Sequence, residues 1–125
     1  MSFEWSDYLA LARNLYQQGI IHSSKEAELR SAISRAYYAA FCKARNHLRD
    51  KEKIVLSEGG QVHAEVQNAF LSSSDRRRKE IGQNLNRLRL FRNQADYRDK
   101  LSRLDKTTAT SLELADDIIS EIRKL

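Results

Sequence analysis

The chain has little that would interrupt a helix. Its 125 residues include no proline and only four glycines, two of which stand together at Gly59-Gly60. Proline and glycine are the residues that most strongly oppose the interior of an α-helix, so their scarcity leaves long helical stretches uninterrupted. No segment shows the alternation of apolar and polar residues that is typical of a strand. The sequence therefore predicts an all-α protein.

Cysteine and long apolar runs are also scarce, which excludes several classes of protein. Cys42 is the single cysteine, so an internal disulfide framework and a cysteine-rich zinc site are excluded. Glu4 and Asp7 interrupt any apolar run at the N-terminus, which is not the pattern of a signal peptide. No stretch approaches the ~20 apolar residues needed to span a bilayer. We expect a reduced intracellular compartment, most simply the cytoplasm, and no membrane partner.

The length and charge fit one small domain over residues 1–125. A chain of this size removes roughly two-thirds of its unfolded surface from water. Hydrophobic residues make up 41% and charged residues 31%, as in a globular protein with a solvated surface. The formal net charge of +5 favours a polyanionic partner such as RNA, a nucleotide or an acidic protein. A charge of this size is also common in proteins that bind no nucleic acid.

Apolar residues recur at steps of three and four along several segments, which predicts helices. The first helix runs from about Trp5 to Gln18, and Gly19 is expected to end it. The second opens at Ser23, where Glu26 completes a capping box, and it runs to about Asp50. Its length is on the order of 40 Å. Apolar residues including Ala27 occupy two of its sides, which places this helix at the centre of a bundle.

Three further helices are expected after a loop over residues 51–60. A short helix carries Val62, Val66 and Phe70 on one face. Ser72-Ser73-Ser74-Asp75 then supplies N-capping residues for a helix from about Arg76 to near Gln94. The last helix has a regular apolar seam from Leu101 to Leu125, as in an antiparallel bundle neighbour.

Arg92 falls within the apolar stripe of the fourth helix, where an unpaired guanidinium is costly to desolvate. Asp96, four residues later, is a candidate partner. Arg30 and Arg35 of the second helix could equally reach Asp96, which would make a structural polar cluster. The alternative is a phosphate-binding cluster in which Arg92 acts with Asn93 and Tyr97. From the residues alone the structural clamp is favoured.

Two segments together resemble the HEPN domain. They are residues 30–41, with the sequence RSAISRAYYAAF, and residues 92–97, with the sequence RNQADY. The resemblance begins at residues 5–9, WSDYL, includes the fourth helix with Gly82, and covers nearly the whole chain. It implies an antiparallel up-and-down bundle of four or five helices with a long central second helix, usually forming a homodimer.

The same resemblance carries expectations about function. Many HEPN proteins are metal-independent RNases, often toxins paired with an antitoxin or a minimal nucleotidyltransferase. Others are non-catalytic and bind nucleotides, RNA or partner proteins. Active members carry an arginine, a polar residue, and a histidine four to six positions beyond the arginine. Arg92 and Asn93 match the first two, but Tyr97 stands where the histidine is expected.

The missing histidine weakens the case for catalysis. Histidine suits proton transfer during RNA cleavage because its pKa lies near neutrality, whereas a phenol with a reference pKa of ~10 is a poor base at pH 7. Tyr97 can still donate a hydrogen bond to phosphate, stack on a base, or simply pack. The catalytic residues are therefore unknown, and the predicted ligand-binding residues for RNA or a nucleotide are Arg92, Asn93, Tyr97 and Arg89.

Other candidate residues carry weaker signals. The run Arg76-Arg77-Arg78-Lys79 spreads around its helix and is interpreted as a solvated charge run, with contact to phosphates as the alternative. His63 has no partner at metal-ligand spacing, and Cys42 is interpreted as inert packing. Neither a metal nor a cofactor is predicted.

Three functions are compared. The leading hypothesis is a non-catalytic HEPN-like module that binds RNA, a nucleotide or a partner protein. The second is a metal-independent endoribonuclease of toxin–antitoxin or stress-response type. The third is an accessory partner of a minimal nucleotidyltransferase.

Overall fold

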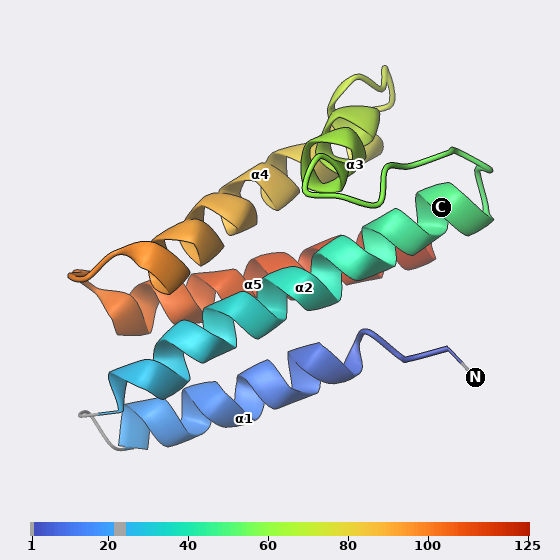
Figure 1. The fold of residues 1–125 in the computed structure, drawn as a ribbon. Helices are drawn as coiled ribbons and strands as arrows, with labels where there is room; N and C mark the ends of the chain where they lie inside the picture. Colours follow the sequence, from blue (N-terminus) through green and yellow to red (C-terminus); the bar gives the residue numbers. More distant parts are fainter. Residues whose placement is uncertain (1, 22–24) are drawn as a thin grey trace.

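The computed structural model describes residues 2–21 and 25–125, which form five helices (Figure 1). They are α1 (Asp7–Ile21), α2 (Glu26–Asp50), α3 (Val62–Leu71), α4 (Arg76–Tyr97) and α5 (Leu104–Arg123). The described ranges contain no strand, and none of their helices has the length and apolarity to cross a membrane. The predicted all-α fold is therefore confirmed.

The four long helices lie side by side, and successive ones run in opposite directions (Figure 1). α2 and α5 pack against each other in the middle of the bundle, with α1 on one side of this pair and α4 on the other. The short helix α3 packs against α4 and α2. This arrangement is the predicted antiparallel up-and-down bundle with a long central second helix.

Helix α2 contacts each of the other four helices because small side chains line much of its surface. Five alanines of α2 are fully buried: Ala32, Ala36, Ala39, Ala40 and Ala44. Among the alanines the larger rings of Tyr37 and Phe41 are also buried. Ala27, expected on an apolar side, is exposed, and Leu29 is buried two residues later. The difference shifts the buried surface of the first turn away from the predicted stripe.

Two buried glycines allow neighbouring elements to approach closely. The prediction that Gly19 ends the first helix is wrong, because α1 continues through it to Ile21. A Cβ atom at Gly19 would lie 2.5 Å from Cδ2 of Leu29 on α2. At Gly82 of α4 a Cβ would lie 2.7 Å from the backbone nitrogen of Leu71, the last residue of α3. Gly82 thus makes room for backbone, which cannot move aside, whereas Gly19 makes room for the side chain of Leu29.

The helix ends follow the predictions in part. The carboxylate of Asp75 accepts a hydrogen bond from the backbone N–H of Arg77 at 3.1 Å, so it caps α4 as expected. The expected cap at Ser23 lies outside the described residues. Helix α4 continues three residues past Gln94, and α5 begins three residues later than Leu101. Arg103, directly before α5, has the left-handed φ of 52°.

Candidate functional site

The guanidinium of Arg92 is held by three side chains at the C-terminal part of α4. Its Nη2 donates to the hydroxyl of Tyr38 at 2.8 Å, and its Nη1 donates to Oδ1 of Asn93 at 3.0 Å. Its Nε lies 2.8 Å from Oδ2 of Asp96, although this N–H does not point along a hydrogen bond. The ion pair expected between Arg92 and Asp96 is thus present, and a phosphate would have to displace these partners.

The other residues predicted to bind a ligand lie on different sides of α4. Asn93 uses its carbonyl oxygen to hold Arg92. Tyr97 is 74% exposed, and its ring centroid lies 5.8 Å from the guanidinium carbon of Arg92. Arg89 is half-buried and faces the interface with α2 and α3, where its charge acts on Tyr37 and His63. Arg89 and Tyr97 stand eight residues apart on α4, so about two helical turns lie between them.

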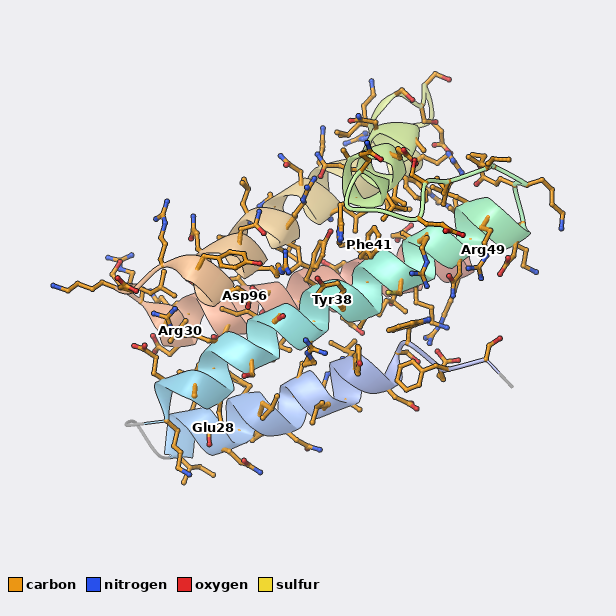
Figure 2. All side chains as sticks on the ribbon, viewed as in Figure 1. Glu28, Arg30, Tyr38, Phe41, Arg49 and Asp96 are labelled. Atoms are coloured by element: carbon orange, nitrogen blue, oxygen red, sulfur yellow. The ribbon has the colours of Figure 1, made fainter. Side chains whose placement is uncertain are left out.

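Arg30 and Arg35 do not pair with Asp96. Arg30 forms an ion pair with Glu26 at 3.0 Å and donates hydrogen bonds to three backbone carbonyl groups at the end of α4. These carbonyls belong to Ala95, Arg98 and Asp99, at distances of 2.9, 2.6 and 3.2 Å. Arg30 thus caps the C-terminus of α4, close to Asp96 (Figure 2).

Arg35 lies between two tyrosine rings instead. Its guanidinium carbon is 4.9 Å from the ring centroid of Tyr8 and 5.5 Å from that of Tyr38. Such stacking is favourable. Within residues 2–21 and 25–125, Arg35 forms no ion pair with an acidic side chain. The predicted cluster of Arg30, Arg35 and Asp96 is therefore divided between two places.

The basic residues at the start of α4 have two roles: one of them holds the fold through an ion pair, and others are exposed to solvent. Arg78 makes two hydrogen bonds to the carboxylate of Glu52, at 2.7 and 3.0 Å. The hydrogen bonds from Arg78 are the largest cause of the lowered pKa of the Glu52 carboxyl group. Arg76 pairs with Glu80 at 3.6 Å on the exposed surface, and Lys79 is exposed. The run shows no shared face for a phosphate backbone.

His63 is the residue that sequence reasoning undervalued. Its Nδ1 lies 2.6 Å from the hydroxyl of Tyr37, and its ring stacks on Phe41 with the ring centroids 4.2 Å apart. Burial is the largest cause that lowers the pKa of His63, followed by the charges of Arg89 and Arg92. At neutral pH the imidazole is therefore uncharged.

The hydrogen bond with Tyr37 also fixes where the His63 proton sits. Tyr37 is 1% exposed, and burial raises the pKa of its phenol, so the phenol keeps its proton. Within the described residues this hydroxyl has no other hydrogen-bond partner, and leaving its O–H unsatisfied would be costly. The O–H therefore donates to Nδ1, and the imidazole proton lies on Nε2.

A hollow of about 560 Å³ opens beside His63. We call it the aromatic–arginine pocket, after the residues that give it its character: Trp5, Tyr8, Arg35, Tyr38, Arg45 and His63. Trp5, in the segment before α1, forms one wall, and the neighbouring Glu4 ties this segment to α2 through an ion pair with Lys43 at 2.6 Å. The guanidinium carbon of Arg45 lies 5.5 Å from the ring centroid of Trp5. The pocket thus combines flat rings with cationic side chains.

The charges around this pocket are not balanced. Arg35, Arg45 and Arg89 are half-buried, and none of them forms an ion pair with an acidic side chain in the described part of the chain. Glu58 is the acidic residue that lines the pocket. With two arginines and one glutamate in its lining, and the charge of Arg89 close to its His63, the pocket favours an anion from solution.

Metal or thiol chemistry finds no support here. Residues 2–21 and 25–125 hold no group of three or more side chains of the kind that bind a metal ion. Cys42 lines the pocket but is buried, and burial raises the pKa of its thiol. A raised pKa disfavours the reactive thiolate, in agreement with the interpretation of Cys42 as inert packing.

Comparison of the chain with protein-family models, with curated proteins and with solved structures finds no match. The resemblance to the HEPN domain therefore stays an expectation that depends on residues 30–41 and 92–97.

Proposed function

We propose that the chain is a HEPN-like module that binds single-stranded RNA at the aromatic–arginine pocket and does not cleave it. The observation that carries this proposal is that Arg35 and Arg45 line the pocket and Arg89 lies near its His63, while none of the three has an acidic partner in the described residues. These cations can neutralise phosphates, and a base can stack on Trp5 or Tyr8.

Single strands fit this site better than a duplex. Stacking on a protein ring requires an unpaired base whose face is free, which loops and single strands offer. The rings come from the segment before α1, from α1 and from α2, so a base inserted among them would be surrounded by arginine side chains. A free nucleotide shares the same chemistry and would bind more weakly because it makes fewer phosphate contacts.

The proton positions favour binding over cleavage. RNA cleavage without a metal needs a base that takes the 2′-hydroxyl proton. In His63 the nitrogen without a proton is Nδ1, and it is occupied by the hydroxyl of Tyr37. Nε2 carries the proton and can donate it in a hydrogen bond to phosphate. His63 therefore supports the binding role, while Tyr97 leaves the expected catalytic position without a histidine.

Binding is tested with fluorescein-labelled single-stranded RNA in EDTA, measured by fluorescence anisotropy. We expect Arg35→Gln and Arg89→Gln each to weaken binding about tenfold, the effect of losing one charge-assisted contact. Arg13→Gln is the matched control, because it removes the same charge from an exposed pair with Asp116 of α5. Equal weakening by all three variants would show that only net charge matters.

The endoribonuclease hypothesis is decided in the same samples by denaturing gels. RNA that stays intact with the wild-type chain supports the binding module. RNA that is cleaved by the wild type in EDTA, but not by His63→Gln, would replace it with an enzyme that uses His63.

A homodimer is part of the proposal. Leu90 and Tyr97, seven residues apart on α4, are 53% and 74% exposed and line a shallow hollow of about 480 Å³. A second copy would cover this apolar surface.

We expect the mass from light scattering to be that of a dimer for the wild type and that of a monomer for Leu90→Glu. A monomeric wild type would contradict this. An antitoxin or nucleotidyltransferase partner stays a prediction.

A further inference from the structure

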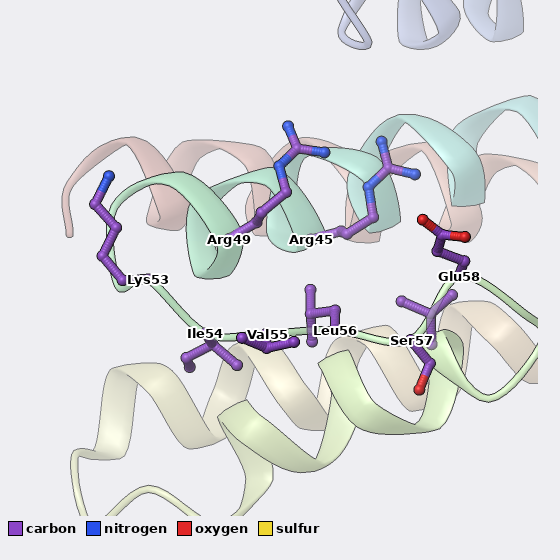
Figure 3. A pocket seen from close by; sticks show the side chains of 9 residues that line it. Arg45, Arg49, Lys53, Ile54, Val55, Leu56, Ser57 and Glu58 are labelled. Atoms are coloured by element: carbon purple, nitrogen blue, oxygen red, sulfur yellow. The ribbon is translucent and has the colours of Figure 1, made fainter.

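The aromatic–arginine pocket is joined to a second hollow at Arg45. The second hollow, of about 670 Å³, shares Arg45, Glu58 and Val62 with the pocket, so the two adjoin along α2. It is also lined by Arg49 of α2 and by residues 53–57 of the loop that follows this helix (Figure 3). A ligand that leaves the pocket beside Arg45 would therefore enter the second hollow.

The arginines of the two hollows stand in one row along α2. Arg35, Tyr38 and Cys42 line the pocket, Arg45 lines both hollows, and Arg49 lines the second one. Their positions differ by steps of three and four, which places them on the same side of the helix. At 1.5 Å per residue, the row from Arg35 to Arg49 is about 21 Å long.

The far end of this row attracts anions. Figure 3 shows the side chains of Arg45, Arg49 and Lys53 extending toward the same side of the loop segment. The hydrogen bond from Arg49 is the largest cause that lowers the pKa of the Asp50 carboxyl group, and the charges of Lys53 and Arg45 add to it. Arg49 and Asp50 pair at 2.7 Å, but both side chains are more than half exposed, and such surface pairs are weak. A phosphate can therefore exchange with this carboxylate.

We propose that an RNA strand bound at the aromatic–arginine pocket continues along α2 into the second hollow, where Arg49 and Lys53 hold its phosphates. This path rests on the proposed function, because it extends the same strand. Arg45 and Arg49 stand one helical turn apart, a rise of about 6 Å, which is close to the separation of consecutive phosphates in an extended strand. The whole row corresponds to a site of about four nucleotides, the lower end of the range for folds that bind single strands.

The two hollows would hold different parts of the strand. Trp5, Tyr8 and Tyr38 offer rings in the pocket on which a base can stack. None of the residues that line the second hollow is aromatic, and its cations stand beside the apolar side chains of residues 54–56. The second hollow therefore contacts the backbone of the strand and not its bases. The expected ligand has an unpaired base for the pocket and any sequence beyond it.

The test compares a uridine dinucleotide, which fills the pocket, with a uridine octamer, which also reaches the second hollow. Affinities in EDTA come from fluorescence anisotropy for the labelled octamer and from NMR titration for the dinucleotide. Arg49→Gln and Lys53→Gln remove cations of the second hollow. Lys51→Gln is the matched control, because this lysine is exposed and lines neither hollow. Circular dichroism verifies that each variant is folded.

We expect Arg49→Gln and Lys53→Gln each to weaken octamer binding about fivefold and dinucleotide binding by less than about twofold, because only the octamer reaches them. Lys51→Gln should weaken neither by more than about twofold. Asp50→Asn should tighten octamer binding about twofold, since it removes the carboxylate that competes for Arg49. A second octamer, in which five consecutive nucleotides lack their bases, should stay sensitive to Arg49→Gln.

Two results would overturn this path. One is octamer binding that Arg49→Gln and Lys53→Gln weaken no more than Lys51→Gln does, and the other is equal weakening of the dinucleotide and the octamer. In both cases a loss of binding in Arg35→Gln would still support the RNA site at the pocket. If neither RNA binds the wild type, the proposed function fails together with the path.

Discussion

The protonation states of Tyr37 and His63 are set together, because the phenol oxygen and Nδ1 lie 2.6 Å apart. Burial opposes charge on both residues: it raises the pKa of Tyr37 and lowers the pKa of His63. Around His63 the charged groups are Arg45 from α2, Arg89 and Arg92 from α4, and Glu58 from the loop that lines the pocket. A bound phosphate would add a negative charge to this surrounding and would favour the imidazolium.

The first prediction at the residue scale concerns pH. The pKa of His63 is lower in the folded chain than its ordinary value of 6.5. The unfolded chain therefore binds more protons as the pH falls below 6.5, and the folded state loses stability in that window. We expect the urea midpoint of the wild type to fall between pH 7 and pH 5.5, and less so in His63→Gln. Identical pH profiles would show that His63 is not the titrating group.

Single residues also show where sequence reasoning reached its limit. Arg92 and Asp96 stand one helical turn apart, so their pairing follows from helix geometry alone. The contact between Tyr37 and His63 joins residues 26 positions apart across the loop over residues 51–60, and no periodicity predicts it. The carbonyl partners of Arg30 lie 65 to 69 residues away along the chain. Local sequence patterns therefore could not show whether Arg30 contacts these carbonyls or the nearby carboxylate of Asp96.

At the scale of elements, the helices were predictable because their apolar residues repeat within each segment. Ile81, Leu85 and Leu88 are all buried, as their spacing along α4 predicts. The helix ends were less predictable, because they depend on neighbours. Gly19 stays helical where its missing side chain makes room for Leu29, a contact that the local sequence does not contain.

The two buried glycines lead to a prediction about stability. In Gly82→Ala the new methyl meets the backbone of Leu71, which cannot move aside, so we expect a loss of about 2 kcal/mol from overpacking. In Gly19→Ala it meets the end of the Leu29 side chain, which can rotate, and the gain of ~1 kcal/mol in helix propensity offsets most of the cost. Urea unfolding of both variants measures the difference. A Gly19→Ala chain as unstable as Gly82→Ala would contradict it.

At the scale of the whole molecule, the chain has 22 basic and 17 acidic side chains, and the excess positive charge is distributed unevenly. Arg35 and Arg45 line one pocket, and Arg89 lies near enough to His63 of that pocket to lower the pKa of its imidazole. In the described residues none of the three has an acidic partner, although they stand far apart in the sequence. The composition could predict an anionic partner. It could not predict this location, because the location depends on the packing of α2 and α4 near His63, and composition carries no information about packing.

The salt dependence of RNA binding follows from this arrangement. If about three phosphates are neutralised, the logarithm of the association constant should fall with the logarithm of salt concentration with a slope of about −2. Arg89→Gln should reduce the slope by about 0.7, the share of one phosphate contact, and Arg13→Gln should leave it unchanged. Anisotropy titrations at several potassium chloride concentrations measure both slopes. A slope near zero would mean that phosphates are not the groups recognised.

The position of Trp5 has an optical consequence. It is the one tryptophan of the chain, it lies at the wall of the aromatic–arginine pocket, and the guanidinium of Arg45 stands 5.5 Å from its ring. A base that stacks there would change the indole's surroundings and quench its emission. The unlabelled protein therefore carries a built-in fluorescent reporter of whether its pocket is occupied.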